Sequence, residues 1–260
     1  MPPALRFAAP TSLPQALALS FQHKRGVRWF YGTSELLAFE AGLVPADAPF
    51  IIDARGIPEL SAIDVGPSIR IGAFVPKAAL ARDAALAEIP ALREVTWSLA
   101  QLCALDARVV IVSEGQYREI EMIKLCGGTL PPSLPPHEFP LQIVFPRPGQ
   151  HAALIERRRA TNDGPASFDQ RVAVSMALAA GGRTAHVRII AHLVDVALMR
   201  VRPAEAKLQH VKPTRVIRSA AAHEAAKLFE AVDSKTSAAL RALPPMILSA
   251  LNDALRGAQL

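Results

Sequence analysis

Residues 172–178 read Val172-Ala173-Val174-Ser175-Met176-Ala177-Leu178, and this stretch decides the fold of the last third of the chain. Large apolar side chains occupy every second position, as expected for a β-strand with one buried face. Gly181-Gly182 follows, and Val187 and Ile189 then resume the alternation. A glycine pair between two alternating runs is typical of a β-hairpin turn. The sequence therefore predicts an antiparallel sheet in this region.

Helices are expected on both sides of this hairpin along the chain. After it, Pro203 is expected to begin a short helix, residues 214–232 to form a longer amphipathic helix, and the last helix to break at Pro244-Pro245. Before it, the pattern predicts helices over 12–24, 35–41, 77–88 and 91–104, the first with a Ser12–Gln15 capping box, and strands over 27–31, 50–52, 62–65, 69–74, 108–112, 118–123 and 141–145.

This order of elements predicts an α+β protein. We expect residues 1–148 to form a domain of two α/β subdomains, about 1–57 and 58–148, and residues 149–260 to form a C-terminal α+β domain with an antiparallel sheet and helices.

Composition excludes several classes of protein. Of the 260 residues, 51% are hydrophobic and 20% are charged, which favours a folded chain over a disordered one. No apolar run reaches membrane-spanning length, and the N-terminus has no secretory signal pattern. With only Cys103 and Cys126, the chain is expected in a reducing compartment such as the cytoplasm.

The positive charge does not indicate a nucleic-acid partner. The net charge is +6, but aromatic residues make up only 5% of the chain. Arg157-Arg158-Arg159 is the one dense basic run, and a solvated surface is the expected place for it. Proteins that bind nucleic acid concentrate their charge and interleave it with aromatic side chains.

No catalytic residues or metal ligands are predicted. His223-Glu224-Ala225-Ala226-Lys227 is close to the zinc motif H-E-x-x-H, but a cationic Lys stands where the second ligand should be. Cys126, followed by Gly127-Gly128, is interpreted as a small loop residue with nothing in the nearby sequence to lower its pKa.

A series of short motifs, each weak alone, occurs in a specific order from about Leu5 to Leu255. They are Phe7, Pro10, Ser12-Leu13 and Gln15-Ala16-Leu17; Ile52-Asp53 and Ile57-Pro58-Glu59-Leu60; Ile69-Arg70-Ile71-Gly72-Ala73; Ala104-Leu105-Asp106-Ala107; Thr129-Leu130, Glu138-Phe139 and Ile143-Val144-Phe145-Pro146; and Arg157-Arg158-Arg159 with the strand 172–178. In this order they resemble the FAD-binding medium subunit of molybdenum hydroxylases, of the carbon monoxide dehydrogenase and xanthine dehydrogenase type.

The resemblance implies a set of functional residues and partners. It implies FAD between the first two subdomains, electrons arriving from an iron–sulfur small subunit, and a large subunit that carries the molybdenum cofactor. The cofactor-binding positions it assigns are Gly32, Thr33 and Ser34 in a first loop, with Ile71, Gly72 and Ala73 at the end of a strand. Glycine loops suit a pyrophosphate because they bring backbone N–H groups close to its oxygens.

The sequence departs from the family at three places on this footprint. Tyr31 stands where the family has the first glycine of its first loop, and Pro76 replaces a threonine. The second glycine-rich loop is missing, because the chain passes from Leu92 through Thr96-Trp97-Ser98 almost directly to Ala100. We therefore expect a vestigial or weak FAD site without stoichiometric FAD, its volume filled by Tyr31 and by Trp97 or Phe74.

Three functional hypotheses remain open at this point. The first is a structural medium subunit of a molybdenum hydroxylase complex without functional FAD. The second is a working FAD subunit with rebuilt loops that passes electrons to an acceptor. The third is a non-enzymatic assembly factor or binding protein. The first two predict a hetero-oligomer and the third does not.

Overall fold

The computed structural model describes residues 6–23, 27–30, 50–113, 116–126, 138–160, 169–192, 198–230 and 237–260. The predicted α+β class is confirmed. The chain forms two compact units, each built from separate stretches: the first from Met1–Pro76, Arg108–Ile120 and Ser133–Val144, the second from Lys77–Ala107, Glu121–Pro132 and Phe145–Leu260. The linear boundary expected near residue 148 stays a prediction.

A small parallel sheet begins the first unit. Its strands are β1 (Arg6–Ala8), β2 (Val27–Phe30) and β3 (Phe50–Asp53), in the order β1-β3-β2. The predicted first helix is α1 (Leu13–Gln22), which packs on β3. The expected capping box is wrong: the Ser12 side chain makes no cap hydrogen bond, and Gln15 Oε1 instead accepts the Thr11 N–H at 3.3 Å.

A five-stranded sheet completes the first unit. Its strands are β4 (Ile63–Val65), β5 (Ser68–Gly72), β6 (Arg108–Ser113), β7 (Gln116–Glu121) and β8 (Phe139–Pro146), in the order β4-β5-β8-β6-β7, and α3 (Pro58–Ser61) lies before β4. Buried side chains from both sheets and from α3, including Ile52, Val112 and Leu60, form one core in this unit. The helix expected over 35–41 lies outside the described residues.

The predicted hairpin is confirmed in the second unit. Strands β10 (Asp169–Leu178) and β11 (Thr184–His192) pair antiparallel, with Val174 opposite Ile189. Gly181 and Gly182 both have positive φ, at 82° and 72°, which a side chain would disfavour. Strands β9 (Ala152–Ala160) and β12 (Met199–Arg200) complete a sheet of order β12-β11-β10-β9.

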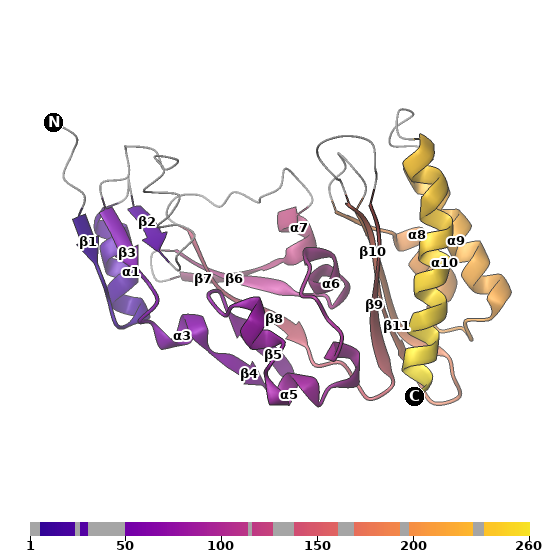
Figure 1. Ribbon diagram of the computed structural model, residues 1–260, viewed down its shortest axis with the longest axis horizontal. Helices are drawn as coiled ribbons and strands as arrows, with labels where there is room; N and C mark the ends of the chain where they lie inside the picture. Colours follow the sequence, from indigo (N-terminus) through magenta and orange to yellow (C-terminus); the bar gives the residue numbers. More distant parts are fainter. Residues whose placement is uncertain are drawn as a thin grey trace. The chain divides into compact units, whose positions relative to one another are not determined.

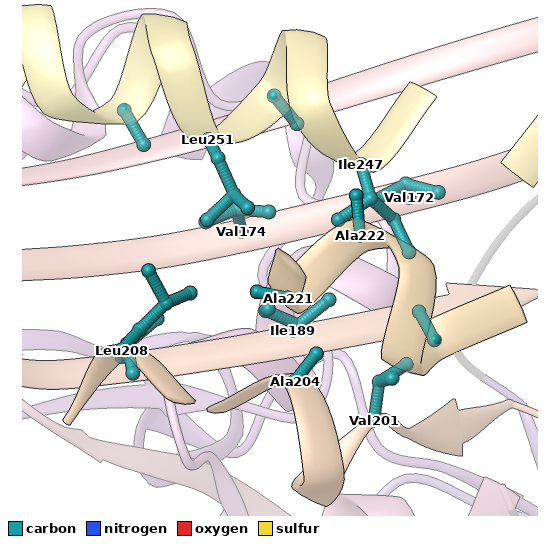
Figure 2. Close-up of a cluster of buried hydrophobic side chains, with 14 of the residues drawn as sticks. Val172, Val174, Ile189, Val201, Ala204, Leu208, Ala221, Ala222, Ile247 and Leu251 are labelled. Carbon is teal, nitrogen blue, oxygen red and sulfur yellow. The ribbon is translucent and has the colours of Figure 1, made fainter. Parts of the chain in front are cut away.

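Three helices cover one face of this sheet (Figure 1). They are α8 (Arg202–Leu208), α9 (Arg215–Glu230) and α10 (Ser237–Gln259). Figure 2 shows the core between them, where Val172 and Val174 of β10 lie beside Ile247 and Leu251 of α10, with Ile189 of β11 in the same cluster. All five side chains are completely buried.

The expected break at Pro244-Pro245 is wrong, because α10 continues through both prolines. Two prolines remove two backbone donors from the helix. The helix nevertheless persists because Leu243, Ile247 and Leu251, before and after the prolines, are buried in the same core. Burial of an apolar face stabilises the helix more than two hydrogen bonds would.

Short helices replace two longer ones that the sequence predicts. The segment 77–88 divides into α4 (Lys77–Leu80) and α5 (Ala84–Ala87), because Asp83 accepts the Leu86 N–H at 2.9 Å and caps the second helix. The segment 91–104 divides into the 3-10 turn η1 (Pro90–Leu92) and α6 (Leu99–Ala104). Strand β7 ends at Glu121, and α7 (Met122–Cys126) follows.

Helix α6 and turn η1 lie against the other face of the β9–β12 sheet. Side chains alternate along a strand, so Ile155 of β9 faces α8–α10 while Glu156 faces α6. The Ser98 hydroxyl before α6 donates to Glu156 Oε1 at 2.7 Å, which confirms the assignment. The second unit is therefore a sheet with helices on both faces.

Candidate cofactor site

The six predicted cofactor-binding residues divide between a described and an undescribed part of the chain. Gly32, Thr33 and Ser34 lie outside the described residues, as does Tyr31. Ile71, Gly72 and Ala73 lie at the end of β5, in the first unit. Ile71 and Gly72 are buried, so of these three only Ala73 is partly exposed.

The backbone donors that follow β5 are already used within the protein. The amides of Gly72, Ala73, Phe74 and Val75 donate to the carbonyls of Ala62, Leu141, Leu60 and Gly72, at 2.8–3.1 Å. A pyrophosphate needs backbone N–H groups that point away from the protein's own acceptors. This stretch does not fit that requirement, because each of the four donors has a protein partner.

Gly72 is needed by the fold whether or not a ligand binds. A Cβ at this position would lie 2.3 Å from the carbonyl oxygen of Leu60 and 2.9 Å from that of Glu59. No side chain fits there, because β5 passes directly against the backbone of α3. The presence of this glycine is therefore explained by packing alone.

A polar segment stands where the resemblance places the second glycine loop. Gln101 is 3% exposed, and its Oε1 accepts the Thr96 and Ser98 N–H groups at 3.1 and 3.2 Å. The Ser98 hydroxyl in turn accepts the Gln101 N–H at 3.1 Å, which completes a capping box for α6. The amides of Thr96 and Ser98 are therefore also unavailable to a phosphate.

The aromatic residues expected to fill ligand volume lie in different units. Phe74 packs edge-to-face on Phe139 at 5.7 Å between ring centroids, and Trp29 stacks on the same ring at 4.0 Å. These three rings belong to the core of the first unit. Trp97 belongs to the second unit, where it is 5% exposed and lies 6.2 Å from the Phe145 ring. That these rings replace a flavin stays a prediction.

Trp97 also explains why the expected helix over 91–104 is interrupted. Its φ is +54°, a left-handed conformation that a bulky residue rarely adopts. Such a residue costs on the order of 1 kcal/mol and persists only where packing fixes it. The buried ring supplies that packing, and α6 begins two residues later.

An ion pair lies at the carboxyl end of the parallel sheet. Asp53 ends β3, and Arg55 donates to both its carboxylate oxygens, at 2.9 and 2.7 Å. These hydrogen bonds hold the pKa of the Asp53 carboxyl below its usual range, against an opposing effect of burial. Arg55 also lies over the Phe30 ring at 4.7 Å. Its charge is thus already neutralised by the chain itself.

The two cysteines form a buried pair rather than a reactive site. Cys103 of α6 and Cys126 of α7 are free thiols, 4% and 0% exposed. A hydrogen bond between the two thiols raises the pKa of Cys103, as does burial, and it lowers the pKa of Cys126 against the opposing effect of burial. The partner that lowers the pKa of Cys126 is thus distant in sequence, and Cys126 ends α7 instead of lying in the expected loop. Among the described residues no His, Cys, Asp and Glu side chains group to hold a metal.

The arginine run is divided between the two faces of β9. Arg157 pairs with Asp253 of α10, whereas Arg158 pairs with Glu156 at 2.7 Å on the opposite face. Arg159 is exposed. Arg158 is exposed as well, and the Arg157 side chain is 40% exposed, so the expected solvated surface is confirmed for Arg158 and Arg159 and holds in part for Arg157. The period of two nevertheless sends Arg157 and Arg158 to different partners.

Glu156 is the residue of this region that the sequence analysis missed. A lone glutamate before three arginines carries no local signal that it will be buried. Only the alternation across 152–160, taken as a strand, could have placed it on the same face as Arg158.

The fold is shared with chains of carbon monoxide dehydrogenases and of quinoline 2-oxidoreductase. A chain of carbon monoxide dehydrogenase from Hydrogenophaga pseudoflava, in a form lacking the Mo-pyranopterin moiety of the molybdenum cofactor, matches with a TM-score of 0.78 and 22% identity over 99% of both chains. A chain of quinoline 2-oxidoreductase from Pseudomonas putida 86 matches with a TM-score of 0.77 and 20% identity over 100% of both. A chain of reconstituted carbon monoxide dehydrogenase from Oligotropha carboxidovorans matches with a TM-score of 0.75 and 19% identity, over 100% of this chain and 99% of that one.

These matches confirm the predicted resemblance at the level of the fold. No family model and no curated protein matches the sequence. Within the described residues, no helix is both long and apolar enough to span a membrane.

Proposed function

We propose that this chain is a medium-type subunit of a molybdenum hydroxylase complex that serves assembly and holds no functional FAD. The observation that carries the proposal is the fold match over 99–100% of the chain to chains of carbon monoxide dehydrogenases and of quinoline 2-oxidoreductase, one of which is described as a Cu,Mo enzyme. The proposed partners are a large subunit with the molybdenum cofactor and a small subunit with iron–sulfur clusters. The proposed setting is the cytoplasm.

The absence of functional FAD is supported by the use of backbone donors. Around Gly72–Val75 and at Thr96 and Ser98, each N–H described above donates to the protein itself. To bind a phosphate, one of these N–H groups would have to break its existing hydrogen bond. The free-energy cost is about 1–3 kcal/mol for a buried donor. Ile71, Gly72 and Ala73, with Gly32, Thr33 and Ser34, are therefore proposed as a vestigial site.

Partner binding is tested by affinity purification of the tagged chain from its native host at low salt. We expect a molybdenum-cofactor subunit and an iron–sulfur subunit to be recovered with it, identified by mass spectrometry and by bound metal. The same tag on an unrelated protein is the control. Recovery of the chain alone would favour a free-standing binding protein instead.

Flavin content is tested on the purified chain and on its complex. We expect far less than one flavin per chain, measured from visible absorption and from the fluorescence of flavin released by denaturation. Titration of the chain with FAD in a calorimeter is expected to give no tight binding. One flavin per chain, or a sub-micromolar Kd, would show a working FAD subunit with rebuilt loops and would leave the partner proposal standing.

A further inference from the structure

Three side chains of the second unit converge on the carboxylate of Glu156. The Ser98 hydroxyl donates to Oε1 at 2.7 Å. Arg158 donates from two nitrogens to Oε2, at 2.9 and 2.7 Å, and the Thr96 hydroxyl lies 3.3 Å from the same oxygen. One oxygen thus has a hydroxyl partner and the other has a guanidinium and a second hydroxyl. Hydroxyls and a guanidinium are the groups that proteins use to bind oxyanions.

The donors are held in place by contacts other than those to Glu156. Gln101 accepts the Thr96 and Ser98 amides and lies 3.0 Å from the Thr96 hydroxyl. Arg158 also donates to the Thr96 hydroxyl, at 2.7 Å. The two hydroxyls therefore keep their positions through α6, while the guanidinium is fixed by Thr96 as well as by the carboxylate.

Burial makes it difficult for water to replace the Glu156 carboxylate in this cluster. The Glu156 side chain is 5% exposed, whereas Arg158 is 42% exposed and Thr96 is exposed. The cluster is thus closed on the side of the sheet and open to solvent along Arg158 and Thr96. Removing the carboxylate would leave a guanidinium and a buried hydroxyl without their main acceptor, which is unfavourable.

We propose that Thr96, Ser98 and Arg158 form an oxyanion-binding site, and that Glu156 is its built-in ligand, which excludes free phosphate. A carboxylate and a phosphate both present oxygens that accept hydrogen bonds from hydroxyls and a guanidinium, so one can replace the other. The anion bound at this site is therefore a side chain of the protein itself. It goes beyond the proposed function and holds whether or not the chain joins a complex.

The test is the thermal stability of the Glu156→Ala variant of the full chain against inorganic phosphate. We expect this variant to melt below the unaltered protein in chloride buffer. Added phosphate should raise its melting temperature in proportion to the logarithm of the phosphate concentration above Kd, by about 5 °C at a concentration about a hundred times its Kd. The unaltered protein, whose site is filled, should show no such logarithmic rise at equal ionic strength.

Two matched variants separate specific binding from a general effect of phosphate. The Glu156→Ala/Arg158→Ala double variant lacks the guanidinium and should not show the logarithmic rise. Glu156→Gln keeps the volume filled and should not gain it either. Folding of the Glu156→Ala variant in phosphate but not in chloride also supports the site. If this variant folds in neither buffer, the same measurements are made on Glu156→Thr, because threonine is favourable in a strand.

The proposal fails if phosphate raises the melting temperature of the single and double variants equally, because the effect is then one of general salt. It also fails if the melting temperature of the folded single variant does not rise with phosphate beyond that of the unaltered protein at equal ionic strength. Retention of FAD by the chain is measured separately, by flavin content, and affects neither result.

Discussion

The Gly72→Ala variant is expected to lose on the order of 3 kcal/mol of unfolding free energy, or not to fold at all. The added Cβ would lie 2.3 Å from Leu60 O and 2.5 Å from Leu60 C, both backbone atoms of a fully buried residue. Relief requires β5 to move from α3. That movement would stretch the hydrogen bonds from Phe74 to Leu60 and from Gly72 to Ala62, at 2.8 and 2.9 Å.

Denaturant unfolding followed by circular dichroism and by tryptophan fluorescence measures this loss, with Trp29 reporting on the first unit. Gly66→Ala is the matched control in the same unit, because a Cβ there meets only Ser68 O at 3.7 Å, an ordinary contact. If both variants unfold within about 0.5 kcal/mol of the unaltered protein, the close approach of β5 and α3 is not as described.

This result bears on how the motif Ile71-Gly72-Ala73 is interpreted. The resemblance assigns it to FAD binding, yet the Leu60 carbonyl alone forbids any side chain at Gly72. A glycine kept for packing remains in the sequence after a ligand is lost. The presence of Gly72 is therefore not evidence for FAD binding. The neighbouring amides are more informative, because they donate to carbonyls of the protein and are not free for a phosphate.

Local patterns predicted the elements whose causes are local. The β10–β11 hairpin follows from alternation and from Gly181-Gly182, and α8 begins at Arg202, with the expected Pro203 in its first turn. The breaks in 77–88 and 91–104 were missed because they depend on one cap, Asp83, and on one residue with positive φ, Trp97. Helical periodicity does not report either feature.

Elements whose causes are distant in sequence could not be predicted. Strand β1 pairs with β3, more than forty residues later, and nothing in Arg6–Ala8 specifies that partner. Strand β9 was missed because Arg157-Arg158-Arg159 suggests a surface run, although its side chains find partners as far away as α10. The continuity of α10 through Pro244 and Pro245 likewise depends on a core that the complete fold creates.

The Glu205→Ala variant is expected to lose about 3 kcal/mol of unfolding free energy in the second unit. Strand β12 pairs with β11 only at Ile190 and Ala191, after which the chain turns into α8. The buried Ile189 N–H therefore has no strand partner on that side, and Glu205 Oε1 accepts it at 2.9 Å. Alanine would remove this acceptor and leave the buried donor without its partner.

The same change removes the counter-ion of a partly buried arginine. Arg200 donates to Glu205 Oε2 from two nitrogens, at 2.9 and 2.8 Å, and these hydrogen bonds raise the pKa of Arg200. The Glu205 side chain is 7% exposed and that of Arg200 27%, so solvent replaces the lost contacts only in part. An unpaired donor and an unpaired charge at one place are the reason for the large expected loss.

Glu205→Gln separates the two contributions, because its amide oxygen can still accept the Ile189 N–H while the negative charge is gone. We expect it to lose about half as much as alanine, by denaturant unfolding under identical conditions. Arg200→Ala, alone and combined with Glu205→Ala, completes a double-mutant cycle. Equal losses for Gln and Ala would mean that the charge alone matters. A loss below about 0.5 kcal/mol for Ala would mean that the end of β11 is satisfied by water instead of by α8.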